Sequence, residues 1–320
     1  MGDITIGIDV GGTKIQAAAV REERVVGTFR LATPLTGARD VAAAIVAVAT
    51  AALAEVEAHP SDVRGVGIGA PGAIDTEAGT VSSSPNLPGF QTSEPVPLGA
   101  MVSEGLAGAP VTIDNDVRVA ILGEWKRGAG RGYRNLLGVW VGTGVGGGLI
   151  LNGEPYRGQG AAGEIGHIIV KPGGRVCSDG RKGHLEAYAG RGRMEVYARE
   201  LHDGGRKTDL FKIMEKKGRS RMSSGVVAEA LEHKDKLAEE LIDGAVWALG
   251  VGLATVQNLL CLEAIVIGGG LGDRLGAPFV ERIEKEMLPL LFVPDQPPKM
   301  LTTEHGDLSG AVGGAVLAGG

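Results

Sequence analysis

Two widely separated segments of the chain share one pattern, in which an apolar run, a glycine-rich turn and a second apolar run follow one another. The first segment spans residues 4–20 and the second spans residues 136–151. When Gly7 is aligned with Gly138, Gly11 of the first turn is aligned with Gly142 of the second as well. Each segment predicts a β-hairpin. Their common spacing predicts two related lobes within one chain.

Between and after these hairpins, stretches with helical periodicity alternate with short apolar runs. The predicted helices lie at 40–59, 117–127, 194–243 and 308–317, and the first has Asp40 as its N-cap and Pro60 as its stop. The predicted strands lie at 63–68, 111–113 and 264–267. The apolar run 245–262 includes Gln257 and Asn258 and leads into a strand, so it predicts a buried helix rather than a membrane span. This alternation is typical of α/β folds.

Composition and charge limit the kinds of molecule that this protein is expected to bind. The chain has 320 residues, of which 43% are hydrophobic and 22% are charged, as expected of a soluble globular protein. Its net charge of −6, without a run of Lys or Arg, argues against nucleic-acid binding. The two cysteines, Cys177 and Cys261, do not make the disulfide framework of a secreted domain, and the start of the chain has no signal-peptide pattern. We therefore expect a cytoplasmic protein with a small-molecule partner.

The glycine turns themselves favour phosphate binding. Backbone N–H groups in such a turn can approach phosphate oxygens because no side chain intervenes. Neither turn is a P-loop, and although Gly142 to Gly147 match G-x-G-x-x-G, the residues that follow continue a strand instead of opening a helix. A single turn of this kind commonly just closes a hairpin. Two matched turns with Thr13, Lys14 and Thr143 beside them favour a nucleotide-phosphate clamp.

Asn115 and Asp116 fall between a predicted strand and a predicted helix. There Asp116 could accept the proton of a substrate hydroxyl, as a carboxylate does in phosphoryl-transfer enzymes. The alternative is a plain N-cap, for which Asn and Asp are both favoured. Asp9, at the end of a strand beside the first turn, suits a water-mediated Mg²⁺ contact, or else it stabilises the turn.

A carboxylate and an imidazole lie close together at Glu164 and His167, and a second carboxylate follows at Glu186. Groups of this kind can pair with several sugar hydroxyls. Charged side chains at a surface are usually only solvated, but Gly163, Gly166 and the apolar residues after them indicate a constrained position at the start of a strand. These three side chains are therefore predicted to bind a sugar.

Taken together, these motifs resemble those of the ROK family of sugar kinases and repressors, and within it the glucokinase branch. The resemblance covers nearly the whole chain. It rests on residues 9–14 as the first phosphate motif, 115–116 as the catalytic pair, 142–148 as the second phosphate motif, 164–167 as the sugar motif and 268–270 as the adenosine motif.

The resemblance implies an actin-like α/β fold of two lobes, 1–117 with 306–320 and 118–305, that close on ATP and a sugar with the active site in the cleft between them. It implies Asp116 as general base on the 6-hydroxyl of glucose, Mg²⁺ accompanying ATP, and a homodimer. The residues implied to hold the sugar are Gly72, Asn86, Asn115, Asp116, Glu164, His167 and Glu186. Those implied to hold the nucleotide are Asp9, Gly11, Gly12, Thr13, Lys14, Gly142, Thr143, Gly144, Gly269 and Gly270.

Two positions depart from the family pattern. Val117-Arg118 stands where the family has Ala-Asn. The family's zinc motif, a His followed by Cys-x-Cys-Gly-x-x-Gly-Cys-x-Glu, here has Asp179 and His184 in place of two cysteines. Carboxylate and imidazole are both zinc ligands, so His167, Cys177, Asp179 and His184 either hold a zinc ion or form a loop that has lost its metal and is held by hydrogen bonds.

Three interpretations of function stay open at this point. The first is an ATP-dependent glucokinase. The second is a kinase for fructose, mannose, N-acetylmannosamine or N-acetylglucosamine, or one that uses polyphosphate as donor, because residue spacing does not determine the shape of a sugar site. The third is a sugar-sensing regulator without catalysis, and the presence of Asp116 counts against it.

Overall fold

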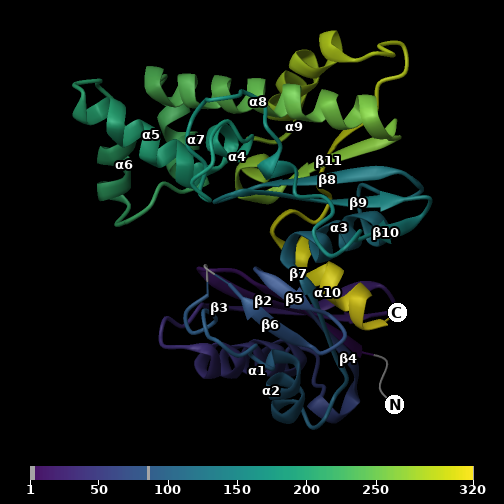
Figure 1. Cartoon of the computed structure of the whole chain (residues 1–320). Coiled ribbons are helices and arrows are strands. Elements are labelled where there is room, and N and C mark those ends of the chain that lie inside the picture. Colours follow the sequence, from purple (N-terminus) through teal and green to yellow (C-terminus); the bar gives the residue numbers. More distant parts are fainter. Residues whose placement is uncertain (1–3, 85–86, 320) are drawn as a thin grey trace. The chain divides into compact units, whose positions relative to one another are not determined.

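The computed structural model of the protein describes residues 4–84 and 87–319. The chain divides into two compact α/β units, Met1–Gly132 with Glu304–Gly320 (unit 1) and Tyr133–Thr303 (unit 2) (Figure 1). The first lobe predicted from the sequence ends earlier, at residue 117. Unit 1 instead includes helix α3 (Asp116–Arg127), because that helix packs against α10 (Ser309–Gly319) and against the first sheet.

Unit 1 is built on a five-stranded sheet in the order β3-β2-β1-β4-β7. The strands are β1 (Ile4–Val10), β2 (Lys14–Arg21), β3 (Arg24–Ala32), β4 (Val63–Ala70) and β7 (Val111–Asn115). The first three pair antiparallel, whereas β1, β4 and β7 run parallel. A separate hairpin is formed by β5 (Ala73–Asp75) and β6 (Thr80–Ser83). The predicted hairpin at 4–20 is therefore confirmed as β1 and β2.

Unit 2 repeats this sheet strand for strand, in the order β10-β9-β8-β11-β12. Its strands are β8 (Leu136–Val141), β9 (Val145–Leu151), β10 (Glu154–Tyr156), β11 (Ala264–Gly268) and β12 (Lys299–Thr302). The first three again pair antiparallel and the other two again join in parallel. The shared connectivity confirms the two related α/β lobes that the aligned glycines predict.

Helices cover both faces of the first sheet. On one face lie α1 (Ala38–Ala54) and α2 (Leu98–Gly105), and on the other lie α3 and the yellow α10 (Figure 1). Because successive residues of a strand point to opposite faces, Ile6 and Ile8 of β1 are fully buried with the α1 side chains, while Gly7 faces α10.

Glycines allow α10 to lie unusually close to the sheet. A Cβ atom on Gly7 would lie 1.7 Å from the carbonyl oxygen of Ala311, and one on Gly67 would lie 1.9 Å from that of Gly314. The small-residue helix α10 therefore packs directly on strands β1 and β4.

The predicted bounds of α1 are wrong at both ends. The helix begins at Ala38 with Gly37 as its N-cap, and Asp40 lies in the first turn, where its carboxylate accepts a hydrogen bond from the Thr36 hydroxyl. A carboxylate in the first turn is favoured by the helix dipole, which gives the same sequence signal as a cap. At the other end the helix stops at Ala54, before a turn in which Glu57 has a φ of 53°.

The helices of unit 2 are α4 (Glu186–Ala189), α5 (Arg191–Asp203), α6 (Leu210–Lys216), α7 (Ser224–Glu232), α8 (Lys236–Leu260) and α9 (Gly269–Met287). The stretch 194–243, predicted as all helix, is broken after α5 at Gly204 and Gly205 and after α6 at Gly218. Short 3₁₀ turns complete the two units at Pro60–Asp62, Ile165–His167, Leu288–Leu290 and Gly306–Leu308.

Helix α8 contains the long apolar run of the sequence. Ala245, Leu249 and Leu253 on this helix are fully buried in the core of unit 2. Among the described residues, no helix combines the length and the apolar composition that a bilayer crossing needs. The expectation of a buried core helix is confirmed.

Candidate active site

The first predicted phosphate turn connects β1 to β2. Its backbone is closed by a hydrogen bond from the Gly11 N–H to the Lys14 carbonyl, 2.9 Å long. Thr33 supports it from the end of β3, because its hydroxyl donates to the Gly11 carbonyl at 2.6 Å and its N–H donates to the Thr13 carbonyl at 3.2 Å. Gly12 and Thr13 are left exposed at the tip. The turn is thus rigid, with its tip accessible to a ligand.

Asp9 and Asp116 are electrostatically coupled beside this turn. The pKa of Asp9 is raised to about 7, mainly by burial and also by the negative charge of Asp116, whereas Lys14 opposes the shift. The start of α10 approaches the same carboxylate, since a Cβ atom on Gly310 would lie 2.7 Å from the Asp9 Cγ. Two carboxylates in one electrostatic environment are stabilised by a cation. Asp9 therefore fits the Mg²⁺ contact predicted from the sequence.

The structure at the junction of β7 and α3 shows which of Asn115 and Asp116 is the N-cap of the helix. The Asn115 side chain is the N-cap, and its Oδ1 accepts from the N–H groups of Val117 at 3.1 Å and Arg118 at 3.2 Å. Asp116 is the first residue of the helix, and its Oδ1 accepts from the Val117 N–H at 2.9 Å. The capping requirement of α3 is met by Asn115, so Asp116 is not needed as the N-cap.

The departure from the family pattern at Val117-Arg118 has a local explanation. Arg118 folds back on the strand, with its Nη2 atom 2.7 Å and its Nε atom 3.0 Å from the Asp114 Oδ1 atom. The Asp114 residue is 3% exposed, so this ion pair is largely desolvated. The arginine therefore neutralises a buried carboxylate next to Asn115 and Asp116.

Unit 1 contributes two further predicted sugar-binding residues. Gly72 follows β4 with a φ of 115°, and a Cβ atom there would lie 2.2 Å from the Ser83 carbonyl oxygen. The turn therefore requires glycine. Asn86 lies outside the residues that the structure describes.

In unit 2 the second predicted phosphate turn repeats the closure of the first. The Gly142 N–H donates to the Gly144 carbonyl at 2.9 Å, and Thr143 is exposed at the tip between β8 and β9. The adenosine motif meets this turn, because a Cβ atom on Gly269 would lie 2.8 Å from the Val141 nitrogen at the end of β8. Gly269 has a φ of 80°, which glycine adopts without strain. The structure thus brings together the two nucleotide motifs predicted in unit 2.

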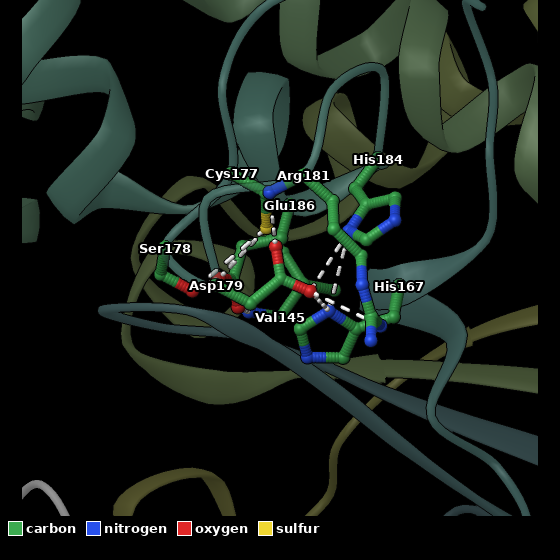
Figure 2. Close-up of polar contacts among 8 residues, drawn as sticks. All are labelled: Val145, His167, Cys177, Ser178, Asp179, Arg181, His184 and Glu186. Atoms are coloured by element: carbon green, nitrogen blue, oxygen red, sulfur yellow. Dashed lines mark hydrogen bonds and ion pairs between the residues drawn. The ribbon is translucent and has the colours of Figure 1, made fainter.

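The four predicted zinc ligands converge in one cluster (Figure 2). His167, Cys177, Asp179 and His184 each present a ligand atom, and all four atoms lie within 4.8 Å of one another. The Asp179 Oδ2 atom lies 3.4 Å from the His167 Nδ1 atom and 3.5 Å from the His184 Nδ1 atom. Sulfur, imidazole and carboxylate ligands at this separation fit a tetrahedral zinc ion.

The electrostatics of the cluster also suit a cation. The Arg181 backbone N–H, with the nearby His184, His167 and Arg181 charges, lowers the pKa of Asp179 despite an opposing contribution from desolvation. Burial raises the pKa of the Cys177 thiol. A metal ion would displace the thiol proton, because thiolate is the form that binds metal.

Glu186 lies beside this cluster and contacts Val145, which directly follows the second phosphate turn (Figure 2). It is 7% exposed, and its Oε2 atom accepts from the Val145 N–H at 2.9 Å. Its Oε1 atom accepts from the Ser178 hydroxyl and, at 3.5 Å, from the Cys177 thiol. The predicted sugar carboxylate is therefore held in place by the loop that carries Ser178 and the candidate metal ligands Cys177 and Asp179. Gly144 leaves room for it, since a Cβ atom there would lie 2.4 Å from the Glu186 Oε2 atom.

Glu164 and His167 occupy the two ends of a short helical turn. Glu164 is exposed and precedes the 3₁₀ turn Ile165–His167, which positions His167 toward the metal cluster. Gly166 allows this turn to pack on β9, because a Cβ atom there would lie 2.0 Å from the Val145 carbonyl oxygen. The predicted constraint by glycines is confirmed, but the predicted strand after it is wrong, because Ile168 to Val170 form only an isolated bridge between Ile169 and His184.

Two residues of this region were not predicted from the sequence. Ser178 donates to Glu186, and the Arg191 Nε atom donates to the Gly142 carbonyl at 3.2 Å. Neither Ser178 nor Arg191 belongs to a sequence motif that would have identified it. A weak signal was available for Ser178, which lies between two candidate ligands.

Comparison with known proteins agrees with these features. The sequence pattern of the ROK family matches residues 5–320. The glucokinase of Streptomyces coelicolor is 33% identical over 98% of this chain and 97% of its own length, and an N-acetylmannosamine kinase of Vibrio cholerae is 30% identical over 98% of each. The crystal structure of a ROK family glucokinase from Streptomyces griseus in complex with glucose and AMPPNP is 33% identical, covers 98% of this chain and 99% of its own, and has a TM-score of 0.82. The chain therefore belongs to the ROK family, and its fold is that of ROK sugar kinases.

Proposed function

We propose that this protein is a glucokinase, which transfers the terminal phosphoryl group of ATP to the 6-hydroxyl of glucose. The observation that carries the proposal is the placement of Asp116 at the first position of α3, beside Asp9, with the capping role taken by Asn115. The similarity to glucokinases, one of them solved with glucose and an ATP analogue, supports the choice of substrates.

In the proposed reaction Asp116 accepts the proton of the sugar 6-hydroxyl as that oxygen attacks the terminal phosphorus. The new O–P bond forms while the P–O bond to ADP breaks, and the proton is left on the Asp116 carboxylate. The start of a helix favours a negatively charged carboxylate, which is the form that can act as the base. Mg²⁺ bound with the nucleotide would offset the charge of the phosphates, and Asp9 is the side chain that would hold it through water.

The remaining predicted residues are proposed to orient the two substrates. Glu164, His167 and Glu186 in unit 2, with Gly72 and Asn115 in unit 1, are proposed to bind the sugar hydroxyls. The two glycine turns and Gly269-Gly270 are proposed to bind the nucleotide through backbone N–H groups.

We further propose that His167, Cys177, Asp179 and His184 hold a structural zinc ion. The convergence of the four ligand atoms supports this proposal. Zinc would close the loop that carries Ser178, and Ser178 donates to Glu186. The metal would therefore act on sugar binding by positioning a carboxylate, without taking part in phosphoryl transfer.

A second substrate class has support of its own. The chain is nearly as similar to an N-acetylmannosamine kinase as to the glucokinases, so a kinase for that sugar is the second candidate.

A cytoplasmic location and a homodimer complete the proposal. The free thiols of Cys177 and Cys261 suit a reducing compartment, and size-exclusion chromatography with light scattering would report the oligomeric state.

The experiment that tests the function is ADP release from ATP and Mg²⁺ across a panel of sugars. The panel contains glucose, mannose, fructose, N-acetylglucosamine and N-acetylmannosamine, with the Asp116→Asn variant as the blank. We expect turnover on glucose that depends on Asp116. A preference for N-acetylmannosamine would keep the mechanism and replace the substrate. If no sugar supports turnover with ATP or with polyphosphate, the protein is not a sugar kinase.

A further inference from the structure

The guanidinium of Arg191 lies at the meeting point of the two nucleotide motifs in unit 2. Arg191 is the first residue of α5, and its Nε atom donates to the Gly142 carbonyl at 3.2 Å. Its Nη2 atom is 3.5 Å from the Thr143 hydroxyl, and it would lie 3.8 Å from a Cβ atom on Gly270. One end of the side chain thus contacts the phosphate turn and the start of α9 together.

The backbone holds this position independently of the side chain. The Arg191 N–H donates to the Gly142 carbonyl at 3.1 Å, and the Gly192 N–H donates to the Thr143 carbonyl at 2.9 Å. The start of α5 is therefore attached to the tip of the second turn by main-chain bonds. A residue without a guanidinium at position 191 would keep those bonds, so the turn does not require an arginine.

No carboxylate neutralises this charge within the described part of the chain. The guanidinium contacts the carbonyls of Gly142 and Met222 and the Thr143 hydroxyl, all of which are uncharged. Burial lowers the pKa of Arg191, and no acidic group offsets that effect. A cation that is partly removed from water and unpaired costs free energy unless an anion binds to it.

We propose that Arg191 is a nucleotide-positioning residue, whose Nη2 edge binds the phosphate chain of the donor at the second glycine turn. This inference rests on the proposed nucleotide role of that turn. Backbone N–H groups alone recognise any anion, whereas a guanidinium adds a full charge with a fixed direction. The sugar motif is not involved, because the contacts of Arg191 are to the turn, Met222 and the start of α9.

The experiment compares nucleotide binding and steady-state kinetics of the wild type with those of Arg191→Met and Arg191→Lys. Calorimetry measures the affinity of each protein for ADP and for adenosine, which lacks phosphate. We expect Arg191→Met to weaken ADP binding and raise the KM for ATP by about tenfold or more, which is the size expected for loss of a charged hydrogen bond. Adenosine affinity and the KM for the sugar stay within about twofold, and Arg191→Lys restores part of the loss because it keeps the charge.

The control variant is Arg206→Met, which removes an exposed guanidinium of unit 2 that pairs with Glu240. It is expected to leave ADP and adenosine affinity unchanged. Equal losses of ADP and adenosine affinity in Arg191→Met would show a purely structural role and overturn the inference, as would an unchanged ADP affinity. If Arg191→Met does not fold, the same comparison is made with Arg191→Lys. An ADP affinity of Arg191→Lys equal to that of wild type at both low and high salt would then overturn the inference. A wild-type protein that binds no adenine nucleotide would overturn the proposed function itself.

Discussion

The Glu124 Oε1 atom on α3 accepts a hydrogen bond of 2.7 Å from the Ser309 hydroxyl at the start of α10. The same carboxylate accepts from the N–H groups of Glu304 and His305, each at 2.9 Å, where the chain returns to unit 1. Glu124 is 1% exposed. A single buried carboxylate thus joins α3, which begins with Asp116, to the segment that leads into the C-terminal helix.

We expect Glu124→Ala to lower the free energy of unfolding by about 3 kcal/mol, because the buried Ser309 hydroxyl and several partly buried N–H groups would lose their acceptor at once. Urea denaturation followed by circular dichroism measures the change. The control is Glu281→Ala on α9, where an exposed carboxylate is removed and a change within about 0.5 kcal/mol is expected. Equal stability of the two variants would contradict the assigned role of Glu124.

The raised pKa of Asp9 makes stability depend on pH. With a folded-state pKa of about 7 against a usual value of 3.8, the folded protein holds this proton over a range in which the unfolded chain has released it. Stability from this group is therefore fully present below pH 4 and is lost as the pH rises to about 7. We expect the melting temperature of Asp9→Asn to be higher than that of wild type at pH 8 and close to it at pH 4. A gain that is the same at both pH values would contradict the pKa shift.

For the base, we expect Asp116→Asn to lower kcat by about 10²- to 10⁴-fold, because the proton acceptor is removed. Sugar affinity, measured by calorimetry, is expected to stay close to wild type. Near-normal turnover in this variant would contradict the assignment of Asp116 as the general base.

For the metal, we expect about one zinc ion per chain in protein purified without chelator or histidine tag, measured by elemental analysis. His184→Ala should lose that zinc and raise the KM for the sugar more than the KM for ATP, because Glu186 is held by the metal loop. Cys261→Ala, which removes the exposed free cysteine, should keep the zinc. Active wild-type protein without zinc would reject the proposed site.

The packing of α10 is tested by a pair of glycine substitutions. Gly7→Ala places a methyl group 1.7 Å from a backbone oxygen of α10, so we expect a loss of at least about 3 kcal/mol or failure to fold. Gly225→Ala in α7 meets atoms no closer than 3.8 Å and should stabilise the protein by up to about 1 kcal/mol, because alanine favours helix. Denaturant unfolding of the two variants measures whether each substitution lowers or raises the free energy of unfolding.

Part of the candidate site could be predicted because its signals are local. A glycine turn between two apolar runs, and Asn115-Asp116 between a strand and a helix, are read from a few adjacent residues. The zinc ligands were predicted from the resemblance to the family's zinc motif, which is easily aligned because three of the ligands lie within eight residues of one another and only His167 is separate. Local signals also gave a wrong boundary, because Asp40 has the residue type of a cap but lies in the first turn of α1, which begins at Ala38.

By itself, the sequence determined the two hairpins, their relationship and the residue types available for phosphoryl transfer, because the turn chemistry and the apolar periodicity of each segment act over short distances. Only the tertiary structure decided which distant residues meet. Glu186 accepts from Val145 across the loop, Arg191 lies on Gly142, and Glu124 lies at Ser309. Those contacts depend on how helices pack on the two sheets, and no spacing along the chain encodes that packing.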